Sequence, residues 1–354
     1  MTSLVLNNTP VRTSKNFKIN NIELKDVNVP QKLSEFKNVN ISNTSSKIKI
    51  NSTVETASIK YGLGEELLNQ INNLSNYNCN YEVNCKIENE VFTDFRLDKY
   101  NRSLVEHINI EAIEGSKATL IFKFETEQDV EAYHNGLITL SAKNNSVINV
   151  IIVNFMNEKS NNFLSIENNI QDNAKVNYYI VDFGGRASVT NYYSNLAGKN
   201  ADNKLNCIYL GRNDQVLDLN YIAELYGEKS NIDIEVQGAL KDFAKKNFKG
   251  TIDFKKGCKK ATGNENENCM LLSNTAKSLA LPMLLCSEED VEGNHSTSSG
   301  KIGEKELFYI MSRGFELKEA MKLMVRAKFN EILQGIKNSK LNEEIQQKID
   351  KCLD

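Results

Sequence analysis

The sequence has 354 residues, with 43 Lys and Arg against 46 Asp and Glu, which gives a formal net charge of -3 at pH 7. Its 40% apolar and 25% charged residues are typical of a soluble globular protein and exclude wholesale disorder. A nearly neutral chain offers no positive footprint for a polyanion, so we expect no nucleic-acid partner. The length is sufficient for two or three domains.

No segment indicates secretion or membrane insertion. The apolar run at residues 4–6 is too short for the core of a signal peptide. No stretch approaches the roughly 20 apolar residues of a spanning helix. The seven cysteines are scattered without a CxxC pair, which favours reduced thiols over disulfides or a structural zinc site. We therefore expect a cytoplasmic protein with no membrane partner.

Asparagine is unusually frequent, with 49 residues or about one in seven. Asn is poor in helices but tolerates left-handed and turn conformations, so the surplus predicts many tight corners. An AT-rich genome would raise Asn and Lys without structural meaning, and composition leaves that explanation open.

Residues 1 to about 90 are polar and weakly patterned. Residues 38–55 indicate loop or edge structure, and the apolar spacing over residues 61–74 predicts a helix. From about residue 90, short alternating segments rich in β-branched and aromatic residues follow one another, bounded by Asn, Gly, Asp or Ser. They lie at 108–112, 118–124, 137–142, 147–153, 163–166, 176–181, 206–210 and 232–236.

No amphipathic helix of ten or more residues separates these segments, so alternating strands and helices fit poorly. Two all-β folds remain: a sandwich or barrel, and a solenoid of stacked short strands. In a solenoid, corners recur at equivalent positions, and stacked Asn side chains can hydrogen-bond along the axis. The pattern favours the solenoid only slightly, because no strict period is visible.

From about residue 301 the pattern becomes helical. Residues 304–313 predict a helix that ends at Gly314, a residue suited to the left-handed position after a helix. Two more helices are expected over residues 317–336 and 342–353, each with one apolar stripe. The core of such a small domain is too small for comfortable independent stability, so we expect it to dock on the β body, on a partner, or on both.

Three enzyme classes lack their motifs. The sequence has no GxxxxGK[ST] phosphate loop and no GxSxG nucleophile elbow. Gly184-Gly185 lacks the GxGxxG frame and is interpreted as a turn. Of the three histidines, we interpret His107 and His134 as surface residues because they lie among charged neighbours.

A dense polar cluster lies between residues 263 and 300, with six carboxylates, two cysteines and one of the three histidines. Thiolate, imidazole and carboxylate are the groups that hold iron and iron–sulfur clusters. Glu265, Glu267 and Cys286 are candidates from this local chemistry. The spacing matches no ferredoxin or zinc motif, and a solvated acidic loop beside two buried thiols is the alternative.

Several motifs of the C-terminal third occur together in one order. They are Phe248-Lys249-Gly250, Leu271-Leu272-Ser273, Pro282, residues 291–302 around His295, Leu307-Phe308-Tyr309-x-x-Ser312-Arg313-Gly314, and Glu319-Ala320. In these motifs the chain resembles the SufB/SufD family of iron–sulfur cluster assembly proteins. The resemblance is strong over about residues 235–335, looser over 100–235, and faint before residue 90 apart from residues 10–13.

The resemblance implies a mainly β fold. A right-handed parallel β-helix over residues 96–300 would lie between a less regular N-terminal α/β region, residues 1–95, and a C-terminal helical domain, residues 301–354. It also implies a scaffold subunit rather than an enzyme. Such subunits pair through their β-helices, and the helical domain docks the ABC-type ATPase SufC. In this chain, the residues expected to bind that partner are Leu307, Phe308, Tyr309, Arg313 and Gly314.

His295 matches the interface histidine of the family, which in SufD-like subunits helps to hold iron or the nascent cluster. The resemblance therefore implies no permanent cofactor, but transient iron or an iron–sulfur cluster at a subunit interface. In SufB-like subunits a Glu follows this histidine, whereas Ser296 stands here. The cluster-building cysteine of SufB-like subunits falls near Glu267, two residues from Cys269.

These departures favour a SufD-like subunit paired with a SufB-like one. The candidate metal ligands are His295, Glu265 and Glu267, and the candidate cofactor-binding residues are His295, Glu267, Cys269 and Cys286. One alternative is a self-associating subunit that itself binds iron or a cluster. A remote alternative is a polysaccharide-active β-helix enzyme, which the absence of a signal segment and of exposed aromatic runs disfavours.

Overall fold

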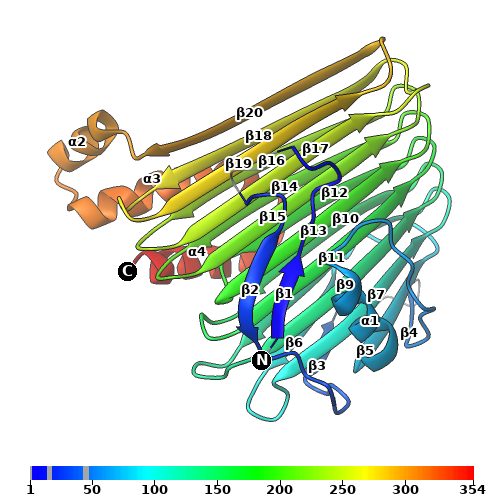
Figure 1. Cartoon of the computed structure of the whole chain (residues 1–354), viewed down its shortest axis with the longest axis horizontal. Coiled ribbons are helices and arrows are strands. Elements are labelled where there is room, and N and C mark those ends of the chain that lie inside the picture. The colour runs from blue at the N-terminus through cyan, green and yellow to red at the C-terminus, as the bar shows by residue number, and fades with distance from the viewer. Residues whose placement is uncertain (1, 14–17, 43–47) are drawn as a thin grey trace.

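The computed structural model describes residues 2–13, 18–42 and 48–354. About half of the chain lies in strands, which form a parallel β-solenoid of about eight turns with helices at the C-terminus (Figure 1). The predicted solenoid is confirmed, and the sandwich or barrel alternative is wrong.

Two sheets of nine strands each form the solenoid. Sheet 1 contains β3 (Val39–Ser42), β6 (Val91–Leu97), β8 (Lys117–Thr126), β10 (Val147–Phe155), β12 (Lys175–Asp182), β14 (Asp202–Gly211), β16 (Asn231–Leu240), β18 (Ala261–Leu271) and β20 (Val291–Lys301). Sheet 2 contains β4 (Ile48–Asn51), β5 (Tyr77–Val83), β7 (Ser103–Ala112), β9 (Tyr133–Ala142), β11 (Asn161–Ile170), β13 (Ala187–Leu196), β15 (Val216–Leu225), β17 (Lys245–Phe254) and β19 (Lys277–Cys286). From β5 onward, successive strands alternate between the two sheets. All pairs are parallel except β3 with β6 and β4 with β5.

The length of one turn varies along the solenoid. Asn161 pairs with Ala187, 26 residues further on, whereas Lys245 pairs with Lys277, 32 residues further on. Strands stay in register because the extra residues are absorbed in the connections. This variation explains why no strict period is visible in the sequence.

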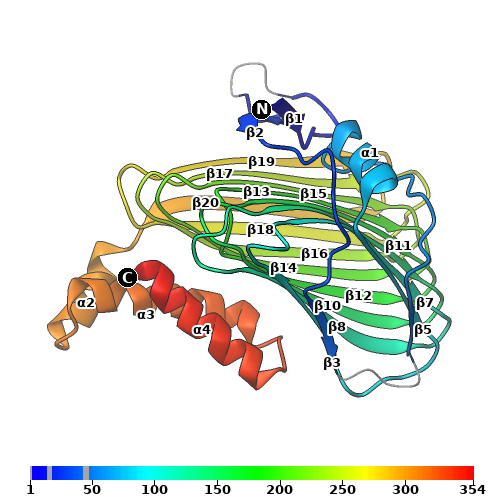
Figure 2. The same cartoon turned by 90° about the horizontal axis from the view of Figure 1, so that it is seen from below.

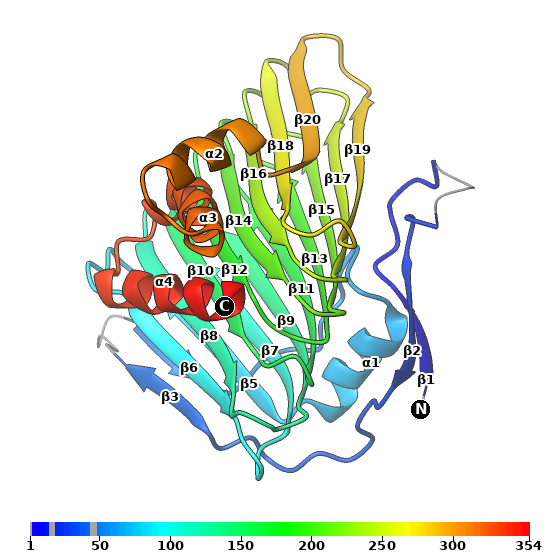
Figure 3. The same cartoon turned by 90° about the vertical axis from the view of Figure 1, so that its left-hand side faces the viewer.

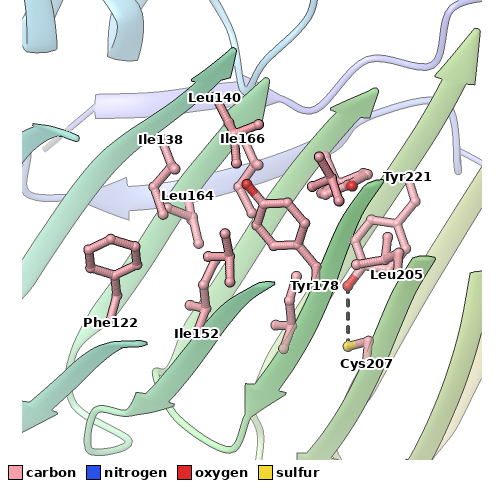
Figure 4. Close-up of a cluster of buried hydrophobic side chains, with 14 of the residues drawn as sticks. Phe122, Ile138, Leu140, Ile152, Leu164, Ile166, Tyr178, Leu205, Cys207 and Tyr221 are labelled. Atoms are coloured by element: carbon pink, nitrogen blue, oxygen red, sulfur yellow. Dashed lines mark hydrogen bonds between the residues drawn. The ribbon is translucent and has the colours of Figure 1, made fainter. Parts of the chain in front are cut away.

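The interior is filled by alternate residues of both sheets, because successive side chains of a strand point to opposite faces. Residues that pair in register form columns, such as Ile108, Ile138 and Ile166. Figure 4 shows this core, in which the Tyr221 hydroxyl donates a hydrogen bond to Cys207 Sγ at 3.2 Å. Each fully buried aliphatic side chain contributes about 1.5–3 kcal/mol of transfer free energy.

Asparagines occupy repeated corners of the solenoid. Asn145, Asn173 and Asn200 all have left-handed φ angles, of 61°, 55° and 54°. Each donates its backbone N–H to a carbonyl in the corner of the next turn, at 2.8–2.9 Å. The Asn200 side chain also donates to Asn173 Oδ1 at 2.9 Å. The expectation that surplus Asn residues form stacked corners is confirmed at these positions.

The N-terminal region covers the outer face of sheet 2. The antiparallel hairpin β1 (Thr2–Leu6) and β2 (Ile22–Val27) lies there with helix α1 (Glu65–Leu74) (Figure 2). Leu67 and Ile71 of α1 pack in one apolar cluster with Leu137 and Phe163 of the sheet. The predicted helix is confirmed with a later start. The predicted loop or edge segment 38–55 contains β3 and β4, and its residues 43–47 lie outside the described residues.

The C-terminal helices α2 (Glu304–Ser312), α3 (Leu317–Leu333) and α4 (Ser339–Leu353) confirm the three predicted helices. Gly314 has φ 96°, as expected for a residue after a helix end. Helices α3 and α4 cover the outer face of sheet 1, where Phe329 stacks on Phe183 with ring centroids 5.9 Å apart. The domain therefore docks on the β body. Helix α2 buries no residue and projects away from the solenoid (Figure 2).

The structure corrects the interpretation of two histidines as surface residues. His107 is 6% exposed and His134 is fully buried. His134 lies inside the solenoid, stacked on Phe124, and its charged neighbour Glu106 is also fully buried. Charged neighbours in the sequence do not show that a histidine is exposed, because a charged residue such as Glu106 can itself face the interior.

A buried line of polar side chains runs from His134 through several turns. His134 Nδ1 lies 2.7 Å from Asn162 Oδ1, and Asn162 donates to Ser188 Oγ at 3.0 Å. Ser188 Oγ donates to Asp182 at 2.7 Å, and Asn154 donates to the other Asp182 oxygen at 2.8 Å. Each of these groups has a partner, which is what burial of polar groups requires.

Other predictions concern turns, thiols and membrane spans. Gly184-Gly185 is a turn between β12 and β13, with Gly185 at φ 94°. All seven cysteines are free thiols. Over residues 2–13, 18–42 and 48–354, no helix combines the length and apolar character needed to cross a membrane.

Candidate functional site

The two ends of the solenoid differ. At the N-terminal end, the antiparallel strands β3 and β4 cover the first parallel strands. At the other end, β19 and β20 are the last strands of their sheets, and no strand within the described ranges pairs with their outer edges (Figure 3). We call this end the open end.

The two edge strands of the open end are not equivalent. Pro282 in β19 has no backbone N–H to offer, which is typical of an edge strand. Strand β20 contains no proline, and all of its eleven residues except Val291 are exposed. A long unpaired strand of this kind is a template for pairing with another chain.

His295 lies at the open end, in the fifth position of β20. It pairs in register with Glu265 of β18, so both side chains belong to a column that faces the interior. Two contacts support this orientation of β20. Ser299 reaches across to Ser278 of β19 at 2.7 Å between the Oγ atoms, and a Cβ at Gly293 would lie 2.8 Å from Leu284. His295 is exposed because no further turn of the described chain covers it.

Glu265 is buried directly below His295. The residue is 2% exposed, and neither carboxylate oxygen has a hydrogen-bond partner. Burial, together with the nearby charge of Glu267, raises the pKa of Glu265 to about 8. The carboxylate lies against Gly250 of the opposite sheet, where a Cβ would come within 2.0 Å of Glu265 Oε2. Gly250 therefore leaves room for this side chain.

Glu267 is also buried, but it is paired. Lys246 of β17 donates to Glu267 Oε1 at 2.7 Å, and both side chains are completely buried. Tyr209 donates to the same oxygen at 2.8 Å. A carboxylate that already neutralises a buried lysine is a poorer metal ligand than the unpaired Glu265.

The candidate cysteines lie apart from His295. Cys269 is buried and pairs in register with Ser299, four residues beyond His295, which corresponds to about 13 Å along the strand. Burial raises the pKa of Cys269, and the charge of Lys246 partly opposes this. Cys286 is exposed at the end of β19, where its Sγ lies 2.9 Å from the Glu288 carbonyl oxygen.

The structure thus places Glu265 beside His295 and separates both from the cysteines. Within the described part of the chain, no group of three or more His, Cys, Asp or Glu side chains gathers to hold a metal ion. The alternative of a solvated acidic loop beside two buried thiols is right only for residues 287–290, an acidic connection between β19 and β20. Most of the segment lies in strands β18, β19 and β20, and only one of the two thiols is buried.

The residues expected to bind a partner form an exposed surface on and after α2. Phe308 is 75% exposed and Tyr309 is 59% exposed, while Leu307 is half-buried. The Arg313 guanidinium donates to the Tyr309 hydroxyl at 2.9 Å and lies over its ring. These side chains do not pack the helical domain on the solenoid. A neighbouring cavity of about 410 Å³ has a lining that includes Leu272, Leu317, Met321 and Leu353.

Residues 95–328 match the family described as SUF system FeS cluster assembly, SufBD core domain, which is well over half of the chain. The chain belongs to the SufBD core family.

Three SufBD relatives share about a quarter of their aligned residues with this chain. The chain is 23% identical over 244 residues to the iron–sulfur cluster assembly protein SufD of Bacillus subtilis, covering 68% of this chain and 56% of the relative. It is 22% identical over 237 residues to SufD of Escherichia coli, covering 67% and 56%. It is 26% identical over 268 residues to the SufBD family protein ycf24 of Antithamnion sp., covering 72% and 88%. The chain thus spans little more than half the length of these SufD relatives.

Two residues that bind Glu267 in this SufBD chain, Lys246 and Tyr209, were not predicted from the sequence. A signal for both exists in the alternation of their strands. Lys246 precedes the core residue Phe248 by two positions, and Tyr209 follows the core residue Cys207 by two. Polar groups at interior positions of a solenoid strand need buried partners, and that requirement points to Glu267.

Proposed function

We propose that the chain is a SufD-like scaffold subunit, rather than an enzyme, and that its open end pairs with a SufB-like subunit. The observation that carries the proposal is the unpaired strand β20, with His295 exposed above the buried Glu265. The seven free thiols fit a reducing compartment, so we place the protein in the cytoplasm. Membership of a cluster-assembly family favours this role over a polysaccharide-active enzyme.

The cargo of the proposed site is iron or a nascent iron–sulfur cluster. His295 offers an exposed imidazole, which is a suitable ligand for iron. Glu265 is mostly protonated at neutral pH because its pKa is about 8. A cation bound at its oxygens would displace that proton. Further ligands would come from the paired subunit, since the two cysteines of this region lie away from His295.

Pairing would extend the backbone ladder of β20 and cover the interior columns that end at the open end. The leading partner is a SufB-like β-helix, and a second copy of this chain is the alternative that the same edge allows. We further propose that the exposed face of α2 docks a SufC-like ABC-type ATPase. The apolar surface of Phe308 and Tyr309, which the solenoid does not use, supports this second contact.

The pairing is tested by placing a bulky cation at the open end. Thr297 belongs to the interior-facing column, whereas Ser298 points to the outer face of the same strand and donates to Asn268 at 2.6 Å. Both residues are exposed. We expect Thr297→Arg to abolish co-purification with the SufB-like subunit of the same organism and Ser298→Arg to preserve it.

Iron binding is tested on the same complex under anaerobic conditions. His295→Ala should remove iron from the complex without separating the subunits. Unchanged pairing in Thr297→Arg would overturn the proposal. A coloured isolated chain that self-associates, and loses its colour in His295→Ala, would instead favour the second copy as the partner.

A further inference from the structure

The residues that follow β1 form an arm across the outside of sheet 2. We call residues 7–13 the N-terminal arm. The backbone N–H of Thr9 donates to the Asn20 carbonyl at 2.8 Å, so the arm continues the β1–β2 hairpin. Figures 1 and 3 show this hairpin running over sheet 2 to the level of β17 and β19.

Contacts of the arm follow one strand after another. Asn7 donates to the Thr190 carbonyl of β13 at 3.1 Å, and Lys249 of β17 donates to the Asn7 carbonyl at 2.9 Å. Further along, the Thr13 hydroxyl lies 4.0 Å from the sulfur of Met283 in β19. The arm therefore crosses the sheet from the middle of the solenoid to its open end.

The anchor of the arm is a buried ion pair. Lys249 Nζ and Asp218 Oδ1 are 2.5 Å apart, and both side chains are completely buried. Asn7 is also fully buried. Its amide donates to Asp218 Oδ1 at 2.6 Å and its Oδ1 accepts from Asn191 at 2.9 Å. Its φ of 60° is one that Asn tolerates better than most residues.

The ion pair and the arm depend on each other. Charges withdrawn from water are stable only when their remaining hydrogen-bonding capacity is satisfied. Burial raises the pKa of Asp218 and lowers that of Lys249, so burial opposes both charges. Asn7 supplies an acceptor to Lys249 and a donor to Asp218. The position of the arm is therefore determined by this anchor rather than by loose surface contacts.

Side chains at the far end of the arm are exposed. Val11 is 42% exposed and Arg12 is exposed, beside the strand that borders the open end. This surface is continuous with the edge that we assign to subunit pairing. We propose that the N-terminal arm forms the outer rim of the contact with the SufB-like β-helix, held in place by the Asn7 anchor. This inference rests on the proposed function.

The test compares two substitutions of equal chemistry in the full-length chain. Asn7→Asp keeps the size of the side chain but sets a carboxylate against Asp218. Asn28→Asp makes the same change at an exposed position after β2. We expect Asn7→Asp to accelerate amide hydrogen exchange over residues 8–13 and to weaken binding of the SufB-like subunit at least 10-fold. Asn28→Asp should change neither quantity.

A second pair of variants covers the case in which Asn7→Asp does not fold. Arg12→Glu reverses an exposed charge of the rim without touching the anchor, and Arg102→Glu does the same at an exposed site before β7. Only Arg12→Glu should weaken pairing. Normal pairing by Arg12→Glu, or by a folded Asn7→Asp with a loosened arm, would overturn the inference. If Thr297→Arg still abolished pairing, the proposed function would survive that result.

Discussion

Asp182 is a buried acid whose ionisation is opposed by the interior of the solenoid. Burial raises its pKa from 3.8 to about 6, although Ser188 and Asn154 both donate to it. Because folding raises this pKa, protonation of Asp182 favours the folded state. The contribution of this proton to the free energy of unfolding is fully present below about pH 4 and is lost as the pH rises through 6. The substitution Asp182→Asn removes this pH-dependent loss of unfolding free energy, because an amide does not ionise. We expect the variant to gain up to about 3 kcal/mol on the wild type between pH 4 and 7, because one pKa unit is worth 1.36 kcal/mol.

Urea unfolding at a series of pH values measures this gain. The exposed Asp214 provides a control, and Asp214→Asn should follow the pH dependence of the wild type. Parallel curves for Asp182→Asn and the wild type would contradict the account of the buried acid.

Glu265 and Glu267 provide a second contrast, since they are two positions apart on one strand and both face the interior. Glu267→Gln leaves the buried Lys246 without its counter-charge, and breaking a buried pair in this way costs about 3–5 kcal/mol. Glu265→Gln replaces an acid that is mostly neutral at pH 7, so we expect a change of less than about 1 kcal/mol. Denaturant unfolding at pH 7 compares the two. Equal losses would show that the two carboxylates are not distinguished by Lys246.

The exposed face of helix α2 is predicted to bind the SufC-like ATPase. Phe308→Asp should leave the unfolding free energy unchanged, because the ring is 75% exposed and α2 buries nothing. It should abolish capture of the SufC-like ATPase in a pull-down. Phe243 offers a matched control, since it is a 63% exposed phenylalanine on a connection of the solenoid. Capture that is lost in Phe243→Asp, or kept in Phe308→Asp, would refute the assignment of this surface.

Elements differ in how far the sequence could predict them. In strands such as β10 and β16, apolar residues alternate with polar ones or follow one another without a break. The helices carry apolar stripes on one face. Both kinds of element were therefore predictable from the sequence. Strands β18 and β20 were not, because their interior positions hold Glu265, Glu267 and His295 in place of apolar residues. A strand whose interior side is polar has no hydrophobic period to detect. The pairing of Lys246 with Glu267 needed the register between sheets, which one sequence does not contain.

At the scale of the molecule, the solenoid is a stack in which each turn buries the one before it. The N-terminal end is covered by β3 and β4, and the outer faces are covered by the hairpin, α1, α3 and α4. The open end is the part of this design that a partner would complete. The Asn-rich corners keep successive turns aligned, so Glu265 and His295 continue the interior column of Leu205 and Ile234 up to the open end.

Hydrogen exchange along β20 tests the central claim most directly. Amides on the outer edge of β20 have no partner strand among the described residues, and pairing would place them in a ladder. We predict that peptides covering Val291–Lys301 become strongly protected when the SufB-like subunit binds, while β14 in the middle of sheet 1 does not change. Equal exchange of β20 in the free and bound chain would contradict the account.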